Sequence, residues 1–364
     1  MNVLLIEHFS PGNSYSEELT KQLCHYETVS VACKSNARNF GENVQQLRVL
    51  YSGGEKKAAA AIKYILGLIR LNREIKSGKY QIVHIQTFKN ARIEIGLYKK
   101  ACKGIKVIHT VHNLLPHEAR ESDRKLYTDF YSFCDALIVH NEECKRQLIE
   151  SFHIENTKIH VIPHGAYSIE PEEITLKKDN KVHFLMFGII RHYKGVDIFL
   201  EAISKIPVSE RKNMEFLVAG KQYGNQNSVD YQAMINDLGI SDCTKLINER
   251  IDDKELPKLF GWTDICVFPY REIYGSGALL MAYAYGKPVI ASDVPVFVEE
   301  TDGGRTGILF RSENSSELAR AIQTSAKWTD VETCKVKKNI AELVDAKYNW
   351  TVSAEKTSDV YRGF

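Results

Sequence analysis

The sequence predicts an α/β protein made of two doubly wound parallel sheets, one in each half of the chain. Short apolar runs alternate with helical stretches from end to end, which is the pattern of strand, helix and parallel strand. The chain has 364 residues, more than one hydrophobic core usually supports, so two domains are expected. The alternation starts afresh after residues 169–181, which are charged and show no apolar period, and we predict a linker there.

The composition excludes several classes of protein. A net charge of +2 and a pI near 8.0 argue against a nucleic-acid binder, which would rely on many phosphate contacts. The eight cysteines show no C-x-x-C pair and no metal spacing, as expected in a reducing cytoplasm. The opening run, MNVLLIEHF, is too short for a signal peptide. We therefore expect a cytoplasmic protein that is neither exported nor membrane-spanning.

The first domain is predicted over residues 1–168. Its opening strand is followed by SPGNS at 10–14 and not by G-x-G-x-x-G, which argues against a nicotinamide enzyme. A histidine, His112, comes directly after a later strand, where ligands bind in open parallel sheets. Strands are expected at 3–6, 28–32, 82–85, 107–111, 137–139 and 159–162, and helices at 16–24 and 55–79.

The second domain is predicted over residues 182–349. The helix that starts at Val196 places apolar residues at i, i+3, i+4 and i+7, the spacing of a core-facing helix. Strands are expected at 182–187, 215–219, 245–247, 264–268, 289–291 and 308–310, and helices at 196–206, 231–238 and 253–260.

The stretch 268–292 gathers polar groups at one point of this second domain. A strand ends at Phe268, and Gly275-Ser276-Gly277 then opens an apolar helix that stops at Gly286-Lys287-Pro288. A helix start offers unpaired backbone N–H groups and the positive end of a dipole, and glycine lets a phosphate approach. Glu272 lies just before it, at the strand end, although a solvated loop acid is the plainer interpretation of Glu272 alone.

A second polar loop, 188–195, follows the first strand of this domain. It carries Arg191 and Lys194, and we expect both at the edge of the sheet that also carries the Gly-Ser-Gly helix start, two strands away. Either a solvated basic loop or an anion site fits this loop alone. The nearby helix start favours an anion site, with a cradle and two counter-charges for a diphosphate.

The residues also resemble the retaining glycosyltransferases of family four, which have the GT-B fold. The runs FGIIRHYKGVDIFLEAI, VIPHG, HTVHN and FPYREIYGSGALLMAYAYGKPVIAS carry the resemblance, which spans most of the chain. It implies two Rossmann-like domains facing a central cleft, with a C-terminal helix, about 350–364, that crosses back to the first domain.

The resemblance also implies roles for individual residues. Arg191 and Lys194 would hold the donor diphosphate, together with Ser276 and Gly277 at the helix start. His112 and Glu272 would be catalytic, with His112 near the anomeric carbon and Glu272 on the donor sugar. Gly12 would approach the donor from the first domain.

Two positions depart from the family pattern. The arginine expected after the first glycine is Ile189, with Arg191 as its substitute, and the second glutamate of the E-x7-E pattern is Leu280. That glutamate usually holds the ribose hydroxyls, so its loss makes a catalytically silent relative an alternative.

The predicted function is transfer of a hexose-type sugar from a nucleotide-diphosphate sugar to a glycan or polyprenyl-linked glycan, in cell-surface polysaccharide synthesis. The sequence has no D-x-D pair, so cations and the helix dipole would stabilise the leaving diphosphate, and we expect no metal and no other cofactor. The alternatives are an epimerase or a phosphorylase on the same fold, and a non-catalytic partner subunit.

Local charge adds a hypothesis about the acceptor side. The apolar stripe Ile62, Ile65, Leu66 and Ile69 of the helix 55–79 is expected to pack on the sheet, leaving basic residues exposed. These could be merely solvated, but we predict electrostatic contact with an anionic membrane, at the inner face of the cell membrane. The basic residues are Lys56, Lys57, Lys63, Arg70, Arg73 and Lys76 on that helix and Lys99, Lys100, Lys103 and Lys106 beyond it.

Overall fold

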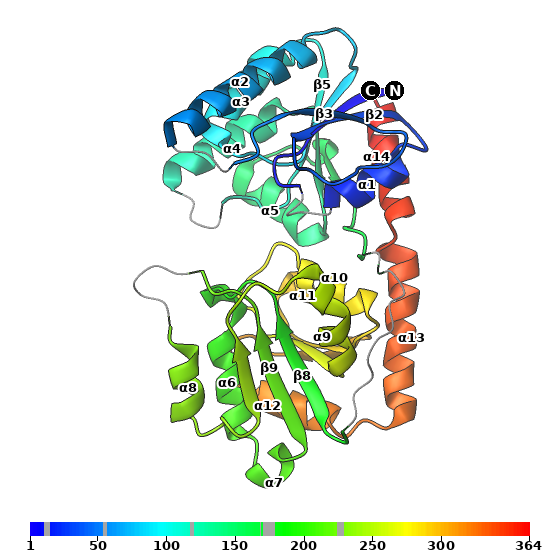
Figure 1. Ribbon diagram of the computed structural model, residues 1–364. Helices are drawn as coiled ribbons and strands as arrows, with labels where there is room; N and C mark the ends of the chain where they lie inside the picture. The colour runs from blue at the N-terminus through cyan, green and yellow to red at the C-terminus, as the bar shows by residue number, and fades with distance from the viewer. Residues whose placement is uncertain (11–14, 54–56, 117–119, 168, 170–178, 224–228) are drawn as a thin grey trace. The chain divides into compact units, whose positions relative to one another are not determined.

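The computed structural model describes residues 1–10, 15–53, 57–116, 120–167, 169, 179–223 and 229–364 (Figure 1). The chain forms two compact units. The first contains residues 1–165 together with 347–364, and the second contains residues 166–346. Most of the predicted linker, 170–178, lies outside the described residues, and so does Gly12. Among the described helices, none is both long and apolar enough to cross a bilayer.

The first unit is built on a seven-stranded parallel sheet with strand order β3-β2-β1-β4-β5-β6-β7. Its central strands are buried on both faces, as their unbroken apolar runs predict. The strands are β1 (Asn2–Ile6), β2 (Thr28–Lys34), β3 (Gln45–Leu50), β4 (Ile82–Ile85), β5 (Lys106–Thr110), β6 (Ala136–Val139) and β7 (Ile159–Val161).

Helices cover both faces of this sheet, and the last of them comes from the far end of the chain. Helix α14 packs against α1 and belongs to the first unit, as the family resemblance predicts. A Cβ at Gly165 would lie 2.4 Å from the Trp350 ring, so only glycine fits under the start of α14. The helices are α1 (Tyr15–Leu23), α2 (Lys57–Ile75), α3 (Ala91–Ala101), α4 (Glu121–Phe133), α5 (Glu142–Phe152) and α14 (Trp350–Arg362).

The second unit repeats the same winding on a six-stranded parallel sheet, with strand order β10-β9-β8-β11-β12-β13. Its strands are β8 (Val182–Phe187), β9 (Met214–Ala219), β10 (Thr244–Ile247), β11 (Ile265–Phe268), β12 (Val289–Ser292) and β13 (Gly307–Phe310). Its α-helices are α6 (Val196–Lys205), α7 (Val208–Arg211), α8 (Tyr231–Asp237), α9 (Leu256–Trp262), α10 (Gly277–Ala284), α11 (Pro295–Glu300), α12 (Ser315–Ser325) and α13 (Asp330–Lys347).

The strand order corrects one expectation about the second unit. The two polar loops follow β8 and β11, which pair directly through Ile265 and Phe184, so they leave neighbouring strands and not strands two apart. The winding reverses between these two strands, and that is where open α/β sheets bind ligands. In the first unit the reversal falls between β1 and β4, which also pair directly.

Helix α2 corrects a second expectation. The residues of α2 buried against the rest of the unit include Leu68, Leu71 and Ile75, and Gly67 is buried as well. A Cβ at Gly67 would lie 2.7 Å from the Val49 carbonyl oxygen, so this face of the helix touches the β3 backbone. The predicted core stripe lies on the opposite face and is exposed at Ile62, Ile65, Leu66 and Ile69. Helix α2 is therefore apolar on two faces, and periodicity alone selected the wrong one.

Candidate active site

The loop after β8 is shaped by glycines that let it approach its neighbours closely. Gly188 has a φ of +113°, and a Cβ at Gly220 would lie 2.0 Å from the Gly188 carbonyl oxygen. Gly195 has a φ of +70°, and a Cβ there would lie 2.0 Å from the Pro269 carbonyl oxygen. Residues between these points form a short 3-10 turn, His192–Lys194, directly before α6. Glycines thus bring this loop against the loop after β11.

The ammonium group of Lys194 lies near both loops, close to Gly188 and to the Tyr270 ring. The side chain is buried, and its Nζ lies 5.2 Å from the centre of the Tyr270 ring. Burial lowers the pKa of Lys194, the Tyr193 phenol raises it, and the nearby positive charge of Arg191 lowers it again. In the part of the chain that the structure describes, no carboxylate contributes to that pKa. A buried cation without an anionic neighbour is costly, and a bound anion would relieve that cost.

Helix α10 begins beside this ammonium group. A Cβ at Gly188 would lie 3.0 Å from Lys194 Nζ and 3.7 Å from Ala278 Cβ, so the ammonium group and the first turn of α10 both adjoin Gly188. The Ser276 hydroxyl accepts a hydrogen bond from the Leu279 N–H at 3.2 Å and so caps the helix. The N–H groups that precede Leu279 have no partner inside the helix. Cation and helix dipole therefore act on the same small volume.

Arg271 ties the two loops together. Its guanidinium donates two hydrogen bonds to the carboxylate of Asp197, at 3.0 and 2.6 Å, and one to the His192 carbonyl at 2.8 Å. Its backbone N–H donates to the Tyr193 carbonyl at 2.7 Å. Hydrogen bonding to Asp197 raises the pKa of Arg271, which stays charged throughout. Arg271 is a positioning residue that we did not single out from the sequence, where it is only one member of a charged pair.

Glu272 lies on the rim of this site. Its side chain is exposed. Burial raises the pKa of the Tyr193 phenol, the charges of Lys194 and Arg191 lower it, and the charge of Glu272 raises it.

Sequence reasoning missed two further groups near the start of α10. The Tyr167 hydroxyl would lie 2.7 Å from a Cβ at Gly277, so it stands directly against the first residue of the helix. The buried carboxylate of Glu300 places its Oε1 3.9 Å from where a Cβ would lie at Gly275. Tyr167 lies just after the VIPHG run, and Glu300 ends α11, so neither stands in the motifs that identified the site. Leu280, in contrast, is buried in the core.

His112 lies in the first unit, in a network of neutral rings at the carboxyl edge of its sheet. Its Nδ1 lies 3.3 Å from His140 Nε2, and its Nε2 lies 3.1 Å from the Gln86 side-chain oxygen. The Tyr15 ring contacts His112, His140 and His164 with centroid separations of 4.8, 5.1 and 4.9 Å. Burial lowers the pKa of His140 to about 4 and that of His164 to about 3, and it holds the pKa of His112 well below its usual value.

The hydrogen bonds of this network fix which nitrogen of His112 carries the proton. His140 Nδ1 faces the Ile162 carbonyl at 3.1 Å, and a carbonyl only accepts, so Nδ1 of the neutral His140 is protonated. His140 Nε2 must then accept from His112 Nδ1–H, which leaves His112 Nε2 as an acceptor. All these hydrogen bonds are satisfied when the oxygen and the nitrogen of the Gln86 amide are exchanged, so that the nitrogen faces His112 and the oxygen faces His84. His112 thus has a neutral ring, and its hydrogen bond to His140 sets its tautomer.

Comparison with known proteins identifies the family. Residues 13–166 match the model described as Glycosyltransferase Family 4, and residues 181–327 match the model described as Glycosyl transferases group 1. This chain belongs to glycosyltransferase family four. Its two polar loops fall in the second match, and His112 falls in the first.

Curated relatives and solved structures agree with this assignment. A D-inositol 3-phosphate glycosyltransferase of Paenarthrobacter aurescens is 24% identical over 80% of this chain and 75% of its own length. A GDP-mannose:glycolipid 4-beta-D-mannosyltransferase of Xanthomonas campestris pv. campestris is 25% identical over 63% of each chain. The structure of HepE of Anabaena, in complex with UDP and glucose, superposes with a TM-score of 0.77 over 100% of each chain, at 15% identity. The chain is a glycosyltransferase with the GT-B fold.

The structure brings together five of the predicted site residues of this glycosyltransferase. The loops that follow the paired strands β8 and β11 carry all five, at the reversal of the second unit: Arg191, Lys194, Glu272, Ser276 and Gly277. His112 belongs to the first unit. The described residues also contain no cluster of three or more histidine, cysteine or acidic side chains that could hold a metal ion.

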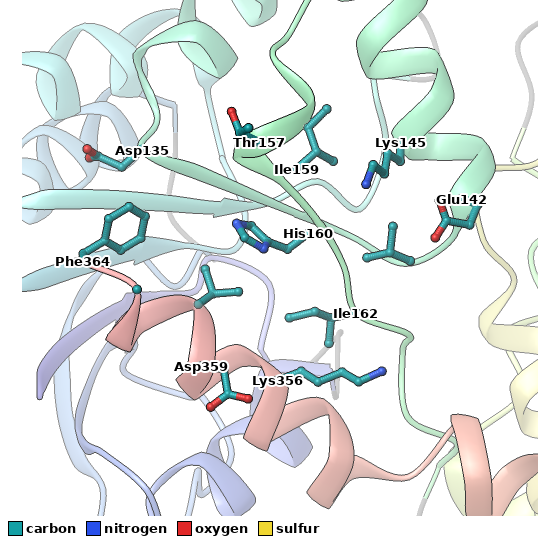
Figure 2. Close-up of a pocket in the computed structure, with 13 residues that line it drawn as sticks. Asp135, Glu142, Lys145, Thr157, Ile159, His160, Ile162, Lys356, Asp359 and Phe364 are labelled. Carbon is teal, nitrogen blue, oxygen red and sulfur yellow. The ribbon is translucent and has the colours of Figure 1, made fainter.

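A separate pocket of about 640 Å³ lies in the first unit, along the edge strand β7 and helix α14. Figure 2 shows Lys145 and Glu142 on one side of it and Lys356 and Asp359 on the other. Its lining residues include none of the six predicted site residues that the structure describes. The charges around it are mixed in sign.

Proposed function

We propose that this glycosyltransferase is a retaining hexosyltransferase, which moves a hexose-type sugar from a nucleotide-diphosphate sugar to a glycan or polyprenyl-linked glycan in cell-surface polysaccharide synthesis. One observation carries the donor assignment: the buried Lys194, whose pKa the charge of Arg191 lowers, and the N-terminal turn of α10 both adjoin Gly188. A diphosphate matches this arrangement because it offers two negative groups to two cations and a helix dipole.

The chemistry that we assign to the site is stabilisation of the leaving group. The bond between the anomeric carbon and the diphosphate oxygen breaks, and negative charge builds on that oxygen. Lys194, Arg191 and the first amides of α10 are preorganised to stabilise this charge. Electrostatic stabilisation of this kind is usually the largest single contribution to enzyme catalysis. These groups supply the positive charge that a divalent cation supplies elsewhere, so we propose that transfer needs no metal.

Retention follows if the acceptor attacks from the face that the diphosphate leaves. The leaving phosphate oxygen then takes the proton of the acceptor hydroxyl, and no protein carboxylate forms a covalent intermediate. In this scheme Glu272 hydrogen-bonds the hydroxyls of the donor sugar. His112 contributes a neutral imidazole near the anomeric carbon, because a network of buried rings holds its pKa low and sets its tautomer.

The acceptor side of the proposal rests on the relatives and on local charge. One relative is named for a glycolipid acceptor, and basic residues crowd the helix α2 of the first unit. We infer that the enzyme works as a peripheral protein at an anionic membrane, where a lipid-linked glycan is presented.

The test is a screen of nucleotides followed by an assay of nucleotide release. Nucleoside diphosphates are first ranked by thermal shift, because a ligand at a hundred times its dissociation constant stabilises a protein by about 2.7 kcal/mol. The matching sugar nucleotides are then incubated with glycan and polyprenyl-linked acceptors, and the anomeric configuration of the product is read by NMR. Acceptor-dependent release with a retained anomer supports the proposal. Isomerised donor without release, an inverted product, or an absolute need for a divalent cation contradicts it.

A further inference from the structure

The outer face of α2 is apolar as well as basic, and this changes how the first unit would meet a lipid surface. Ile62, Ile65, Leu66 and Ile69 follow the spacing i, i+3, i+4 and i+7 and are 60, 54, 46 and 42% exposed. We call these four residues the outer stripe. Single exposed apolar residues are common, but four on one helical face form a continuous patch that calls for an explanation.

Packing of the described part of the first unit leaves about half of the outer stripe exposed. Leu68, Leu71 and Ile75 already anchor α2 from the opposite face, and Gly67 sets the helix against the β3 backbone. In Figure 1 α2 lies beside α3, and the α3 residue Ile93 is also exposed, at 50%. The stripe is therefore an apolar surface that the described part of the chain leaves open.

The charges around the stripe select the kind of partner. Lys63 and Arg70 flank the stripe on one side, and Arg73 and Lys76 lie beyond its C-terminal end. All four side chains are exposed. The only acidic residue of α2, Glu74, is hydrogen-bonded to Tyr80 at 2.8 Å and paired with Lys79. A helix with an apolar face bordered by cations and almost no acid matches the interface of an anionic bilayer, where apolar side chains enter the acyl boundary and cations meet headgroups.

We propose that the outer stripe of α2 inserts into the interface of an anionic membrane, with Lys63, Arg70, Arg73 and Lys76 on its headgroups. This inference deepens the proposed function, because it names the surface by which the enzyme meets a lipid-linked acceptor. It replaces purely electrostatic contact with contact that is partly apolar. In a parallel sheet the helix after a strand begins at the carboxyl edge, so the start of α2 lies at the edge that carries His112.

The test compares vesicles of phosphatidylcholine alone with vesicles that also contain phosphatidylglycerol, using co-sedimentation of the full chain. We expect much stronger binding to the anionic vesicles. Ile65→Gln/Ile69→Gln should lower the partition coefficient at least tenfold, because glutamine keeps the helix but removes the apolar face. The control pair Val208→Gln/Val331→Gln removes apolar residues that are 64 and 79% exposed elsewhere and should leave binding unchanged.

A second arm separates insertion from charge. Arg70→Gln/Arg73→Gln should weaken binding by about fivefold per cation, whereas Lys335→Gln/Lys337→Gln on α13 should not. Raising the salt concentration should weaken wild-type binding without removing it completely. The binding that remains at high salt should be lost in Ile65→Gln/Ile69→Gln. Tryptophan at the stripe in Ile69→Trp should shift its emission to the blue and be quenched by brominated lipid, unlike Val331→Trp.

Several results would overturn the inference. Failure of the wild type to sediment, equal binding to both kinds of vesicle, or unchanged binding of Ile65→Gln/Ile69→Gln each contradicts it. A dimer in solution that this pair dissociates would assign the stripe to a second copy of the chain. Thermal shift with nucleoside diphosphates in the same samples reports donor binding, so loss of vesicle binding with donor binding intact rejects the surface and not the proposed donor site.

Discussion

The two units share one winding but carry opposite chemistry at the edge where their strands end. Both sheets reverse beside their first strand, between β1 and β4 in one and between β8 and β11 in the other. In the second unit the reversal holds buried positive charge and a helix start. In the first unit the nearby edge holds His112, His140 and His164, whose pKa values are all lowered by burial. The scaffold fixes where a ligand binds, and the loop residues decide which charge it must have.

The difference extends to what holds each edge in place. Arg271 locks the charged loops of the second unit by an ion pair with Asp197 and by hydrogen bonds that it donates to the backbone carbonyls of His192 and Tyr193. The first unit uses neutral hydrogen bonds between rings, in which the tautomer of His112 depends on His140. A charged site suits a diphosphate, and a neutral site suits sugar and acceptor hydroxyls.

Removal of the buried cation should have the largest effect. Lys194→Ala is expected to abolish measurable transfer and leave the fold intact, since a charge-assisted contact to phosphate contributes about 1.5 to 3 kcal/mol and the transition state carries more charge than the ground state. The measurement is acceptor-dependent nucleotide release, with circular dichroism to check folding. Lys212→Ala, at an exposed position before β9, is the matched control. Activity within twofold of wild type would reject the diphosphate assignment.

Acid should destabilise the first unit before the second. His84, His109, His140 and His164 have folded pKa values of about 3 to 4, below the unfolded value near 6.5. Each is neutral in the fold, so its stabilising effect is complete above pH 6.5 and is lost as the pH falls toward the folded pKa. The loss is at most about 1.4 kcal/mol per pH unit and histidine. Hydrogen exchange at pH 5 and pH 7 should show the first unit opening at acid pH; equal protection at both values would contradict the neutral network.

Glu272→Gln tests whether separate residues of the second unit contact the donor sugar and the nucleotide. We place this exposed carboxylate on the donor sugar, so turnover should fall about tenfold while affinity for the bare nucleoside diphosphate stays within twofold. Steady-state kinetics and calorimetric titration measure the two effects separately. An equal loss in both would move Glu272 to the nucleotide side of the site.

Arg271→Lys should have a smaller effect. Lysine keeps the charge but loses the two-pronged bond to Asp197, so the loops loosen and kcat/KM should fall severalfold. A double-mutant cycle with Asp197→Asn should show that the two losses are not additive, because both remove the same contact. Additive losses would mean that Arg271 acts directly on the donor and is more than a positioning residue.

Much of this could be predicted from the sequence because unbroken apolar runs mark buried parallel strands. The strand 182–187 and the core spacing of α6 agree with the prediction, and the family resemblance is confirmed. The strand β3 was missed because QQLRVL has too few apolar residues to stand out, and its residues are only partly buried. The face of α2 was misjudged because Leu68, Leu71 and Ile75 have the same helical spacing as the outer stripe.

The site was predicted only where residues stand in motifs. Lys194 and Ser276 follow strands in recognisable loops, but nothing in the sequence shows that Arg271 joins these loops or that Tyr167 stands at Gly277. Such contacts depend on strand order, and the sequence placed the two loops two strands apart when they are neighbours. Gly12 lies outside the described residues, and its predicted role stays a prediction.

The most direct test of the central claim is a calorimetric comparison of a nucleoside diphosphate with the same nucleoside, on the wild type and on Lys194→Met. The base is the one that the thermal-shift screen selects. If Lys194 and the start of α10 hold the diphosphate, the wild type should bind the diphosphate at least tenfold more tightly than the nucleoside, and Lys194→Met should lose most of that difference while its nucleoside affinity stays the same. A difference that persists in Lys194→Met would contradict the account and place the diphosphate elsewhere.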